Sequence, residues 1–446
     1  MQSNSLLSVF QRMCARPIAA ALAALLLAAP VARAQSEEDA LPVTVWTIAG
    51  DDSGPGYARL ITVTPASSPA SIIQQLKARP VGSRGLLLTG FANDITTRET
   101  IRRRRAATTA AVPSPWVDKG IATVRARVNN LMVRLMRANA QVEFVVVQCD
   151  ASLRAAEYDQ YGAPGWRAIQ TDSRFAAVRT AIGSVDFVAE MTAFSEVRAA
   201  WDRYFDASLD NALHKAIVTT TRRYFPNAQF VAQNRYSLPA SSIVTSARNG
   251  GGFGNYDQPQ FYLQGTGADP FASLGVILTD VAAIRAASGR AVVPSIPTPS
   301  WTGGGSGLPA FSGSAYWSEL VYHLRLTGAP SILMDRGVPS GEELAMLRDL
   351  IAAVQERAGG LAISPYVSSA SVDADVAVAS AIQAGGTVHW RLTAAPGVAS
   401  LRITFTDDTT QDVAIEPGSV GAWFDHPDSQ QIAFIQTPGE GGGGSG

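Results

Sequence analysis

Short apolar runs rich in β-branched residues recur along most of the chain. The most apolar of them is Phe144-Val-Val-Val147, within residues 141–148. Such a run is typical of a strand that is buried on both faces, as in a parallel sheet. Five further runs predict strands at residues 43–49, 85–91, 228–234, 290–296 and 329–334.

Between these runs the apolar residues change to helical spacing. In residues 116–138, for example, Ile121, Val124 and Val128 recur every three or four positions. Helices are predicted at residues 69–77, 116–138, 174–182, 194–224, 270–287, 316–326 and 342–357. Residues 246–267, rich in Gly, Asn, Gln and Tyr, are expected to be a long loop.

The alternation of strand and helix from residue 43 to 358 favours an α/β fold with a parallel sheet. We predict a (β/α)8-type parallel barrel over this range. Two of its eight strands are not evident in the pattern, and residues 185–191 are one candidate for a missing strand.

From Gly360 the pattern changes to period-two alternation punctuated by turn residues. Strands are predicted at residues 387–393, 401–406, 411–415, 422–425 and 430–436. We expect a small antiparallel, β-sandwich-like domain over residues 361–437. Residues 438–446 form a Gly-rich tail that is expected to be flexible.

The first 34 residues have the composition of an export signal. Arg12 and Arg16 precede an Ala/Leu-rich apolar stretch, and Ala32-Arg-Ala34 is a cleavage site of the small-x-small type. The stretch is too short to span a membrane comfortably, and we expect no later segment to span one. The mature chain is therefore expected to start near Gln35 and to be exported, to the periplasm or the medium, without stable membrane insertion.

Charge and cysteine content narrow the function classes further. The formal charge is −1 over 446 residues, and loss of the signal removes three arginines and no acid, leaving −4. Such a chain gives no reason to expect a nucleic-acid partner. Cys149 is then the one remaining cysteine, so no intrachain disulfide can form and stability must come from core burial.

Polar and aromatic residues gather where the predicted strands end. They are Asp51, Asp52, Asp94, Gln148, Asp150, Asn234, Tyr236, Trp301 and Asp335. Because ligands bind at the carboxyl ends of parallel strands, these side chains are expected to meet on one rim. Carboxylates beside aromatics suit cleavage of a glycosidic bond: one acid protonates the leaving oxygen, a second group attacks or stabilises the anomeric carbon, and ring faces hold the sugar.

Asp150 is the best candidate for the general acid, because it follows the most apolar strand. It could instead cap a helix that begins at Ala151. Glu190 is the second catalytic candidate: it joins the rim if residues 185–191 are a strand, and otherwise only favours the positive end of the following helix. The Arg102–Arg105 run is either a solvated surface or a site for an anionic polymer.

Other chemistries find little support in the sequence. His214 and His323 lie within predicted helices, and His389 and His426 lie in the β region, so a His-ligated metal site or a Ser-His-Asp triad is disfavoured. No phosphate-binding motif is present, and Cys149 has no histidine placed to activate it. We therefore expect neither a metal nor a cofactor.

This layout, an exported α/β barrel followed by a β module, resembles the TIM-barrel glycoside hydrolases. It is also similar to the hyaluronidase-type barrels, in which an acidic Asp-x-Glu motif ends a strand and a later strand ends on a tyrosine. Here Gln148-Cys-Asp150 stands at the acidic motif and Phe230 to Tyr236 at the later strand. Because Gln148 replaces the first acid, the resemblance is carried over for the fold and not for the substrate.

The resemblance implies an exported glycoside hydrolase acting on a polysaccharide or glycoconjugate. The alternative is a catalytically inert carbohydrate-binding or surface protein on the same fold. The two differ in whether Asp150 has an acidic neighbour at a catalytic separation.

Overall fold

The computed structural model divides the chain into two units, Met1–Ala40 and Leu41–Gly446. All described residues belong to the second unit. They are 45–50, 53–54, 56–91, 98–100, 111–113, 117–148, 155, 166–167, 170, 176–183, 186–193, 195–233, 256–258, 269–301, 315–359, 364–365, 376–384, 386–426 and 431–438. The predicted signal peptide, Arg102–Arg105 and all but the first residue of the Gly-rich tail lie outside them.

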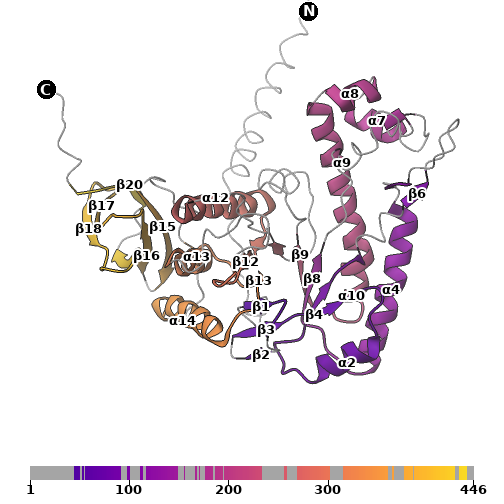
Figure 1. Ribbon diagram of the computed structural model, residues 1–446, viewed down its shortest axis with the longest axis horizontal. Coiled ribbons are helices and arrows are strands. Elements are labelled where there is room, and N and C mark those ends of the chain that lie inside the picture. Colours follow the sequence, from indigo (N-terminus) through magenta and orange to yellow (C-terminus); the bar gives the residue numbers. More distant parts are fainter. Residues whose placement is uncertain are drawn as a thin grey trace, which may run out of the picture. The chain divides into compact units, whose positions relative to one another are not determined.

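Parallel strands form two sheets, with the orders β12-β13-β1-β3-β2 and β11-β10-β9-β8-β5-β4 (Figure 1). Their strands are β1 (Val45–Thr47), β2 (Ser53–Gly54), β3 (Tyr57–Arg59), β4 (Ile61–Val63), β5 (Gly85–Leu88), β8 (Phe144–Gln148), β9 (Gln229–Gln233), β10 (Tyr256–Gln258), β11 (Ala291–Val292), β12 (Ser295–Pro297) and β13 (Ile332–Arg336). The β2–β3 pair is antiparallel and the other pairs of these sheets are parallel. A separate antiparallel pair consists of β6 (Arg98–Thr100) and β7 (Ala111–Pro113).

The two parallel sheets are continuous through the chain at two points. Leu60 alone separates β3 from β4, and Val293 and Pro294 separate β11 from β12. The backbone remains hydrogen-bonded at both junctions, from Leu60 N to Thr47 O at 2.8 Å and from Leu333 N to Pro294 O at 2.9 Å. Each of these two segments therefore contributes to both sheets.

All six predicted strands of this region are present, with shifted ends. The pattern did not predict β3 and β4, within residues 57–63, or β10. The loop expected at residues 246–267 is therefore interrupted by a strand, β10, at residues 256–258. The strand proposed at 185–191 is also wrong, because the helix α8 (Phe187–Ala193) occupies that position. The predicted parallel α/β core is confirmed; its closure into a barrel stays a prediction here.

Every predicted helix is confirmed. The helices are α2 (Pro69–Lys77), α4 (Val117–Arg137), α7 (Ala176–Ile182), α9 (Ser195–Leu213), α10 (Thr219–Arg222), α12 (Pro270–Ser288), α13 (Ala315–Leu326) and α14 (Gly341–Arg357). The single helix predicted at 194–224 consists of α9, a π-helical turn η3 (His214–Val218) and α10.

Alternate strand residues build an inner layer between the parallel strands. It contains Trp46, Ala58, Leu60, Leu87, Phe144, Val146, Val231, Val293 and Leu333. Trp46 stacks on Phe144 with ring centroids 4.6 Å apart. A Cβ atom on Gly85 would collide with the Trp46 ring, so only glycine fits beside it.

The intervening strand residues pack outward against helices. Leu86, Leu88, Val145 and Val147 form one core with α2, α4 and η3, while α12, α13 and α14 form a second. Burial of both strand faces explains why these strands read as continuous apolar runs.

α12 departs from the expectation that no later segment could span a membrane. Judged by length and composition alone, residues Pro270–Ala287 are long and apolar enough to cross a membrane, with a mean hydropathy of 1.4. However, Leu274, Leu278 and Ile284 of α12 are buried in the second core. The apolar residues of α12 are thus explained by packing within the protein.

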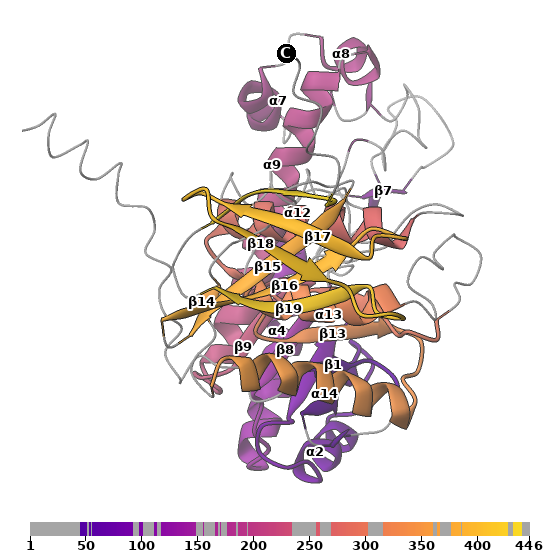
Figure 2. The ribbon, with the colours of Figure 1, turned by 90° about the vertical axis from the view of Figure 1, so that its left-hand side faces the viewer.

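The C-terminal region contains two antiparallel sheets, β14-β15-β16-β19 and β18-β17-β20 (Figure 2). Their strands are β14 (Ser364–Pro365), β15 (Ala377–Ala384), β16 (Thr387–Ala394), β17 (Ser400–Phe405), β18 (Thr410–Ala414), β19 (Gly421–His426) and β20 (Ile432–Gln436). Both sheets contribute to one core that includes Trp390, Leu401 and Phe424. The predicted antiparallel region is confirmed, whereas its limits at 361 and 437 stay predictions.

Candidate functional site

Three of the predicted rim residues are described, and they lie on two strands and one loop. Gln148 is the last residue of β8 and is half-buried. Asp335 is the penultimate residue of β13, also half-buried, and Trp301 follows β12. Asp51, Asp52, Asp94, Asp150, Asn234 and Tyr236 lie outside the described residues.

Strand register places glutamine positions side by side at the carboxyl ends of three neighbouring strands. Gln148 of β8 pairs with Gln233 of β9, and Gln233 pairs with Gln258 of β10. Of these three, only Gln148 is predicted from the sequence as a rim residue, because the apolar pattern does not reveal β10 and predicts the end of β9 one residue later. The register therefore adds two amide-bearing positions to the candidate rim.

The segments that follow β12 and β13 are tied to each other. Glu343 accepts hydrogen bonds from Ser300 N and, through its other oxygen, from Ser340 N, both at 2.7 Å. Trp317 of α13 donates its indole N–H to Pro297 O at 3.1 Å. These bonds hold the backbone that leads to Trp301, whose side chain is partly exposed.

A close contact further fixes these two segments. Gly337 has φ of +83°, a left-handed conformation that favours glycine, and a Cβ atom there would collide with the Thr298 hydroxyl. The segment after β13 therefore lies directly against the segment after β12. Preorganised backbone of this kind suits a binding rim, because little ordering remains to be done when a ligand binds.

Glu190 does not lie at a strand end. It belongs to α8, and its Oε1 accepts a hydrogen bond from Asp186 N at 3.3 Å, at the start of that helix. Asp186 in turn accepts from Ala189 N at 3.4 Å. The local role of Glu190 is thus helix capping, which removes the strand-end argument for its catalytic role.

A metal site is not evident in the part of the chain that the structure describes. No three or more His, Cys, Asp or Glu side chains gather there in an arrangement that could hold an ion. The described rim side chains offer amide, carboxylate and indole groups. Such groups suit hydrogen bonding and ring stacking with a polyhydroxylated ligand.

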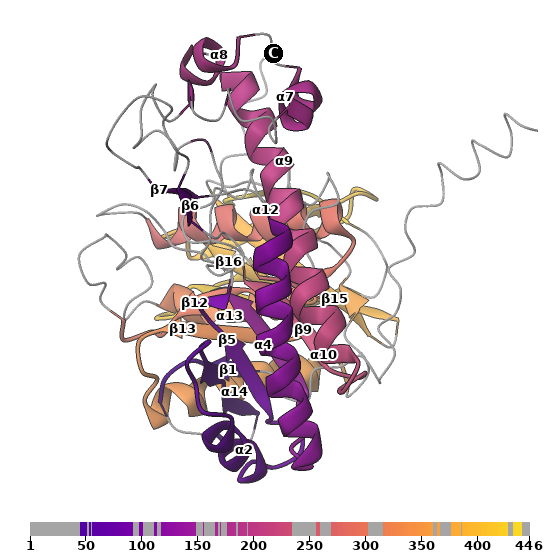
Figure 3. The same cartoon turned by 90° about the vertical axis from the view of Figure 1, so that its right-hand side faces the viewer.

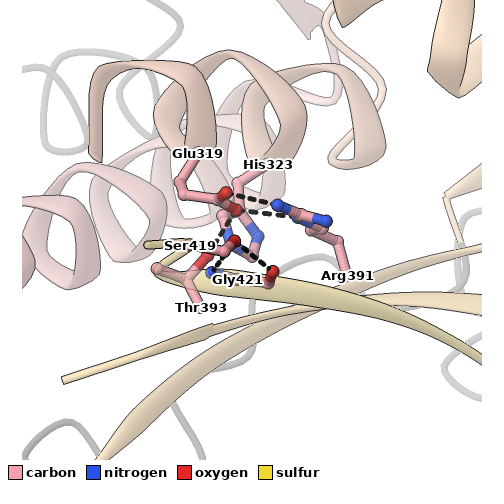
Figure 4. Close-up of polar contacts among 6 residues, drawn as sticks. All are labelled: Glu319, His323, Arg391, Thr393, Ser419 and Gly421. Atoms are coloured by element: carbon pink, nitrogen blue, oxygen red, sulfur yellow. Dashed lines mark hydrogen bonds and ion pairs between the residues drawn. The ribbon is translucent and has the colours of Figure 1, made fainter. Parts of the chain in front are cut away.

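A second polar centre, not predicted from the sequence, is buried between α13 and the sheet of β15 and β16 (Figure 4). Arg391 forms a two-pronged ion pair with Glu319, and Thr393 Oγ1 donates to Glu319 Oε2 at 2.7 Å. His323 lies between Ser380 Oγ and Thr393 Oγ1, at 2.8 Å from each. We call Glu319, His323, Ser380, Arg391 and Thr393 the buried network.

Burial controls protonation in the buried network. His323 is fully buried, and desolvation, reinforced by the positive charge of Arg391, lowers its pKa to about 3. The imidazole is therefore neutral at any ordinary pH. The network joins α13, through Glu319 and His323, to β15 and β16, so its role is to hold helix and sheet together.

Comparisons with known proteins give distant structural likeness only. No family model matches the chain, and no curated protein matches it significantly. A solved exo-beta-agarase is 12% identical over 66% of this chain and 44% of its own, with a TM-score of 0.37. This chain thus spans less than half of that agarase.

Two other similar structures are those of a mannanase and a galactosidase. An endo-beta-1,4-mannanase from Cellulomonas fimi is 11% identical over 90% of this chain and 93% of its own, with a TM-score of 0.30. A GH36 alpha-galactosidase from Geobacillus stearothermophilus, in complex with raffinose, is 8% identical over 87% and 55%, with a TM-score of 0.39. Scores of this size establish neither the fold nor the activity of this chain.

Proposed function

We propose that this protein is an exported glycoside hydrolase that cleaves a polysaccharide or glycoconjugate at the carboxyl ends of a closed eight-stranded parallel barrel. The single observation that carries the proposal is the strand pairing. It leads from β1 through parallel neighbours, by way of the continuous segments β3–β4 and β11–β12, back to β1, and supports a common rim at the carboxyl ends of the strands.

The pairing supports closure as follows. β1 pairs with β13 on one side and β3 on the other. The chain continues from β3 into β4, and parallel pairs then connect β4, β5, β8, β9, β10 and β11 in that order. β11 continues into β12, which pairs with β13. Counting each continuous segment once gives eight strands, the number whose interior side chains just fill.

A barrel of this type positions its active site at the carboxyl ends of the strands. Asp150 follows β8 by two residues, and Asp335 is the penultimate residue of β13, which stands opposite β8 in the proposed ring. Asp150 is proposed as the general acid because the four apolar residues before Gln148 are fully buried. A general acid needs a raised pKa, and a carboxyl group acquires one where apolar surroundings disfavour its charged form.

The remaining rim residues are proposed to hold the sugar. The partly exposed Trp301 offers a ring face, and the glutamine positions at the ends of β8, β9 and β10 offer amides for sugar hydroxyls. Asp94, Asn234 and Tyr236 are proposed for the same rim from their places in the sequence.

The test is a screen of the purified mature chain on a polysaccharide panel, with new reducing ends as the readout. On any substrate that is cleaved, Asp150→Asn is expected to lower the rate by roughly 10²–10⁴-fold, because an amide cannot deliver the proton. Asp349→Asn, at an exposed residue of α14, is the control and is expected to retain the parental rate. A folded Asp150→Asn protein retaining more than about a tenth of the activity contradicts the assignment.

The same screen separates the enzyme from an inert carbohydrate-binding protein. Retention on an immobilised polysaccharide without release of products favours the binding protein. Export is tested independently by N-terminal sequencing of secreted material, which is expected to start near Gln35.

A further inference from the structure

Asp335 of β13 faces the inside of the proposed barrel. Side chains alternate between the two faces of a strand, and residues paired across neighbouring parallel strands share a face. Leu333 belongs to the inner layer, so Asp335, two residues later, is directed inward at the next level towards the carboxyl ends. It is half-buried there. A carboxyl group therefore stands above the apolar layer, at the end of the strands where ligands bind in such barrels.

The inward positions around Asp335 are neutral. Towards the carboxyl ends of the described strands, strand pairing and the inner layer assign the inward face to Ile48, Thr62, Gln148, Gln233, Gln258 and Ser295. These are aliphatic, hydroxyl or amide residues. Among the described inward positions, only that of Asp335 has a carboxyl group, and none has a basic side chain. If the described interior supplies the second catalytic group, that group is Asp335.

A buried hydroxyl lies next to Asp335 on the neighbouring strand. Ser295 of β12 pairs with Leu333 of β13, so it shares the inward face and is the diagonal neighbour of Asp335. Figure 3 shows β12 and β13 side by side. Ser295 is 1% exposed, and its Oγ has no hydrogen-bond partner among the described residues. Such a hydroxyl is unfavourable in a protein interior unless a bound water or ligand satisfies it.

The backbone on both sides of this pair is held in place. Leu333 N donates to Pro294 O, directly before Ser295, at 2.9 Å. Just beyond the pair, Gly337 lies so close to Thr298 that a Cβ atom on the glycine would collide with the threonine hydroxyl. The fold therefore sets the relative positions of β12 and β13 without help from a ligand. Such preorganisation is what the placement of a reacting group requires.

We propose that Asp335 and Ser295 together hold the water molecule that attacks the sugar, with Asp335 as its general base. Diagonal neighbours in a sheet have Cα atoms roughly 7–8 Å apart, which leaves room for one water in hydrogen-bond reach of both side chains. The water supplies the partner that the Ser295 hydroxyl needs, and the carboxylate accepts one of its protons. This inference rests on the proposed function, because it names the second catalytic group of the same site.

The step is an inverting hydrolysis. Asp335 takes a proton from the water while the water oxygen bonds to the anomeric carbon. The bond from that carbon to the glycosidic oxygen breaks, its electron pair stays on the oxygen, and Asp150 supplies the proton that this oxygen takes up. One water is consumed, Asp335 ends protonated and Asp150 ends ionised, and proton exchange with solvent restores both.

The order of strands in the ring favours inversion over retention. Asp150 follows β8 and Asp335 lies on β13, and these two strands stand on opposite sides of the proposed ring. Opposite positions leave the widest gap between two carboxyl groups. Inverting enzymes separate these groups by about 6.5–9.5 Å to admit a water, whereas retaining enzymes bring them to about 5–5.5 Å.

The test uses a substrate that the polysaccharide panel shows to be cleaved. Proton NMR of the freshly released reducing end is expected to show the anomer opposite in configuration to the linkage that was cleaved. Asp335→Asn is expected to lower kcat by roughly 10²–10⁴-fold with little change in KM, because an amide cannot take up the proton. The rise of kcat/KM with pH that a general base produces is expected to disappear in this variant.

Ser295→Ala separates a role in the reaction from a role in folding. The variant removes a buried hydroxyl that has no partner in the described part of the chain, so its melting temperature is expected to equal or exceed that of the parent. Its kcat is nevertheless expected to fall by at least about tenfold, because the water is less well placed. A lower melting temperature at the parental kcat contradicts the role of Ser295.

Asp280→Asn is the matched control. Asp280 is another half-buried aspartate, on α12, and its variant is expected to keep the parental kcat and pH profile. Retention of the anomeric configuration, or a folded Asp335→Asn protein with more than about a tenth of the parental kcat, overturns the inference. Both outcomes leave the proposed function standing, since the parent still cleaves its substrate. A parent chain that cleaves no polymer overturns the proposed function and this inference together.

Discussion

Proton positions in the buried network follow from its donors and acceptors. Thr393 gives its hydroxyl proton to Glu319, so its oxygen must accept a proton from Nε2 of His323. Nδ1 of His323 then has no proton and accepts one from the Ser380 hydroxyl. A neutral imidazole with its proton on Nε2 therefore satisfies every group in this series.

Removing one charge of the buried pair should destabilise the fold strongly. Glu319→Ala leaves Arg391 buried without its carboxylate, and a loss of about 3–5 kcal/mol in the free energy of unfolding is expected. The double variant Glu319→Met, Arg391→Met is expected to recover most of that loss, because no buried charge remains. Chemical denaturation of the three proteins measures both values, and a double variant no more stable than Glu319→Ala contradicts the argument.

Acid should destabilise the fold through His323. The unfolded chain takes up a proton near pH 6.5, whereas the folded chain does so only near pH 3. Stability from this residue is therefore complete above pH 6.5 and is lost as the pH falls towards 3, by about 1.4 kcal/mol per pH unit. His323→Gln is expected to remove that slope between pH 6.5 and 4.

The control for His323→Gln is Leu324→Ala, on the same helix. It creates a cavity and lowers stability but leaves titration unchanged, so its slope is expected to match that of the parent. A His323→Gln protein with the parental slope contradicts the neutral state of the imidazole.

At the scale of elements, the loop after β12 depends on the first turn of α14. Ser340 and Glu343 form a capping box, and Glu343 also accepts from Ser300 N. Ser340→Ala is expected to lower the free energy of unfolding by about 1 kcal/mol, because it removes the helix cap. Glu343→Ala is expected to cost roughly 1 kcal/mol more, since it also releases the segment before Trp301.

Glu342→Ala is the matched control for Glu343→Ala. It removes a neighbouring exposed carboxylate that favours only the helix dipole, so a loss below about 1 kcal/mol is expected. Thermal unfolding of the three variants orders these losses. Equal losses in Glu342→Ala and Glu343→Ala contradict the role of Glu343 as a link.

Elements were predictable from sequence where one physical signal dominated. The long helices have apolar residues at a spacing of three and four, and the buried parallel strands are short continuous apolar runs. β15 was missed because its run Ala377-Val-Ala-Ser-Ala381 has little β propensity; burial between α13 and the second sheet makes it a strand. The seven residues of α8 were open to either interpretation, because capping by Asp186 and Glu190 is not visible in an apolar pattern.

The candidate site was predictable only in part. Strand ends identified Gln148 and Asp335, because a polar residue after an apolar strand is a local feature. The register that sets Gln148 beside Gln233 and Gln258 is not local, and neither is the pairing of Glu319 with Arg391, which are 72 residues apart in the chain.

At the scale of the whole molecule, the C-terminal sheets are expected to be indispensable to the α/β part. Val378 packs into the core of α12, α13 and α14, and Tyr316 donates its hydroxyl to Ala394 O at 3.0 Å. Removing the sheets would expose this core together with Glu319 and His323. The antiparallel region therefore completes the burial of α13 as well as its own core.

Truncation after Gly359 tests this dependence. The shortened chain is expected to aggregate, or to bind a hydrophobic dye and unfold without cooperativity, because the sheet-facing side of α13 would be exposed. Truncation after Pro438 is the control and is expected to leave the melting temperature unchanged. A chain ending at Gly359 that melts cooperatively at the parental temperature contradicts the expectation.

The junction at Leu60 has a consequence for insertions and deletions. Leu60 faces the inner layer, whereas Ile61 and Val63 belong to the outer core under the helices. Adding or removing one residue here would reverse the orientation of side chains along either β3 or β4. Residues that face the inner layer would then face the helices, and the reverse. A loop can absorb a change of length without such an exchange, so homologues that vary in length are expected to vary elsewhere and to keep the spacing from Tyr57 to Val63.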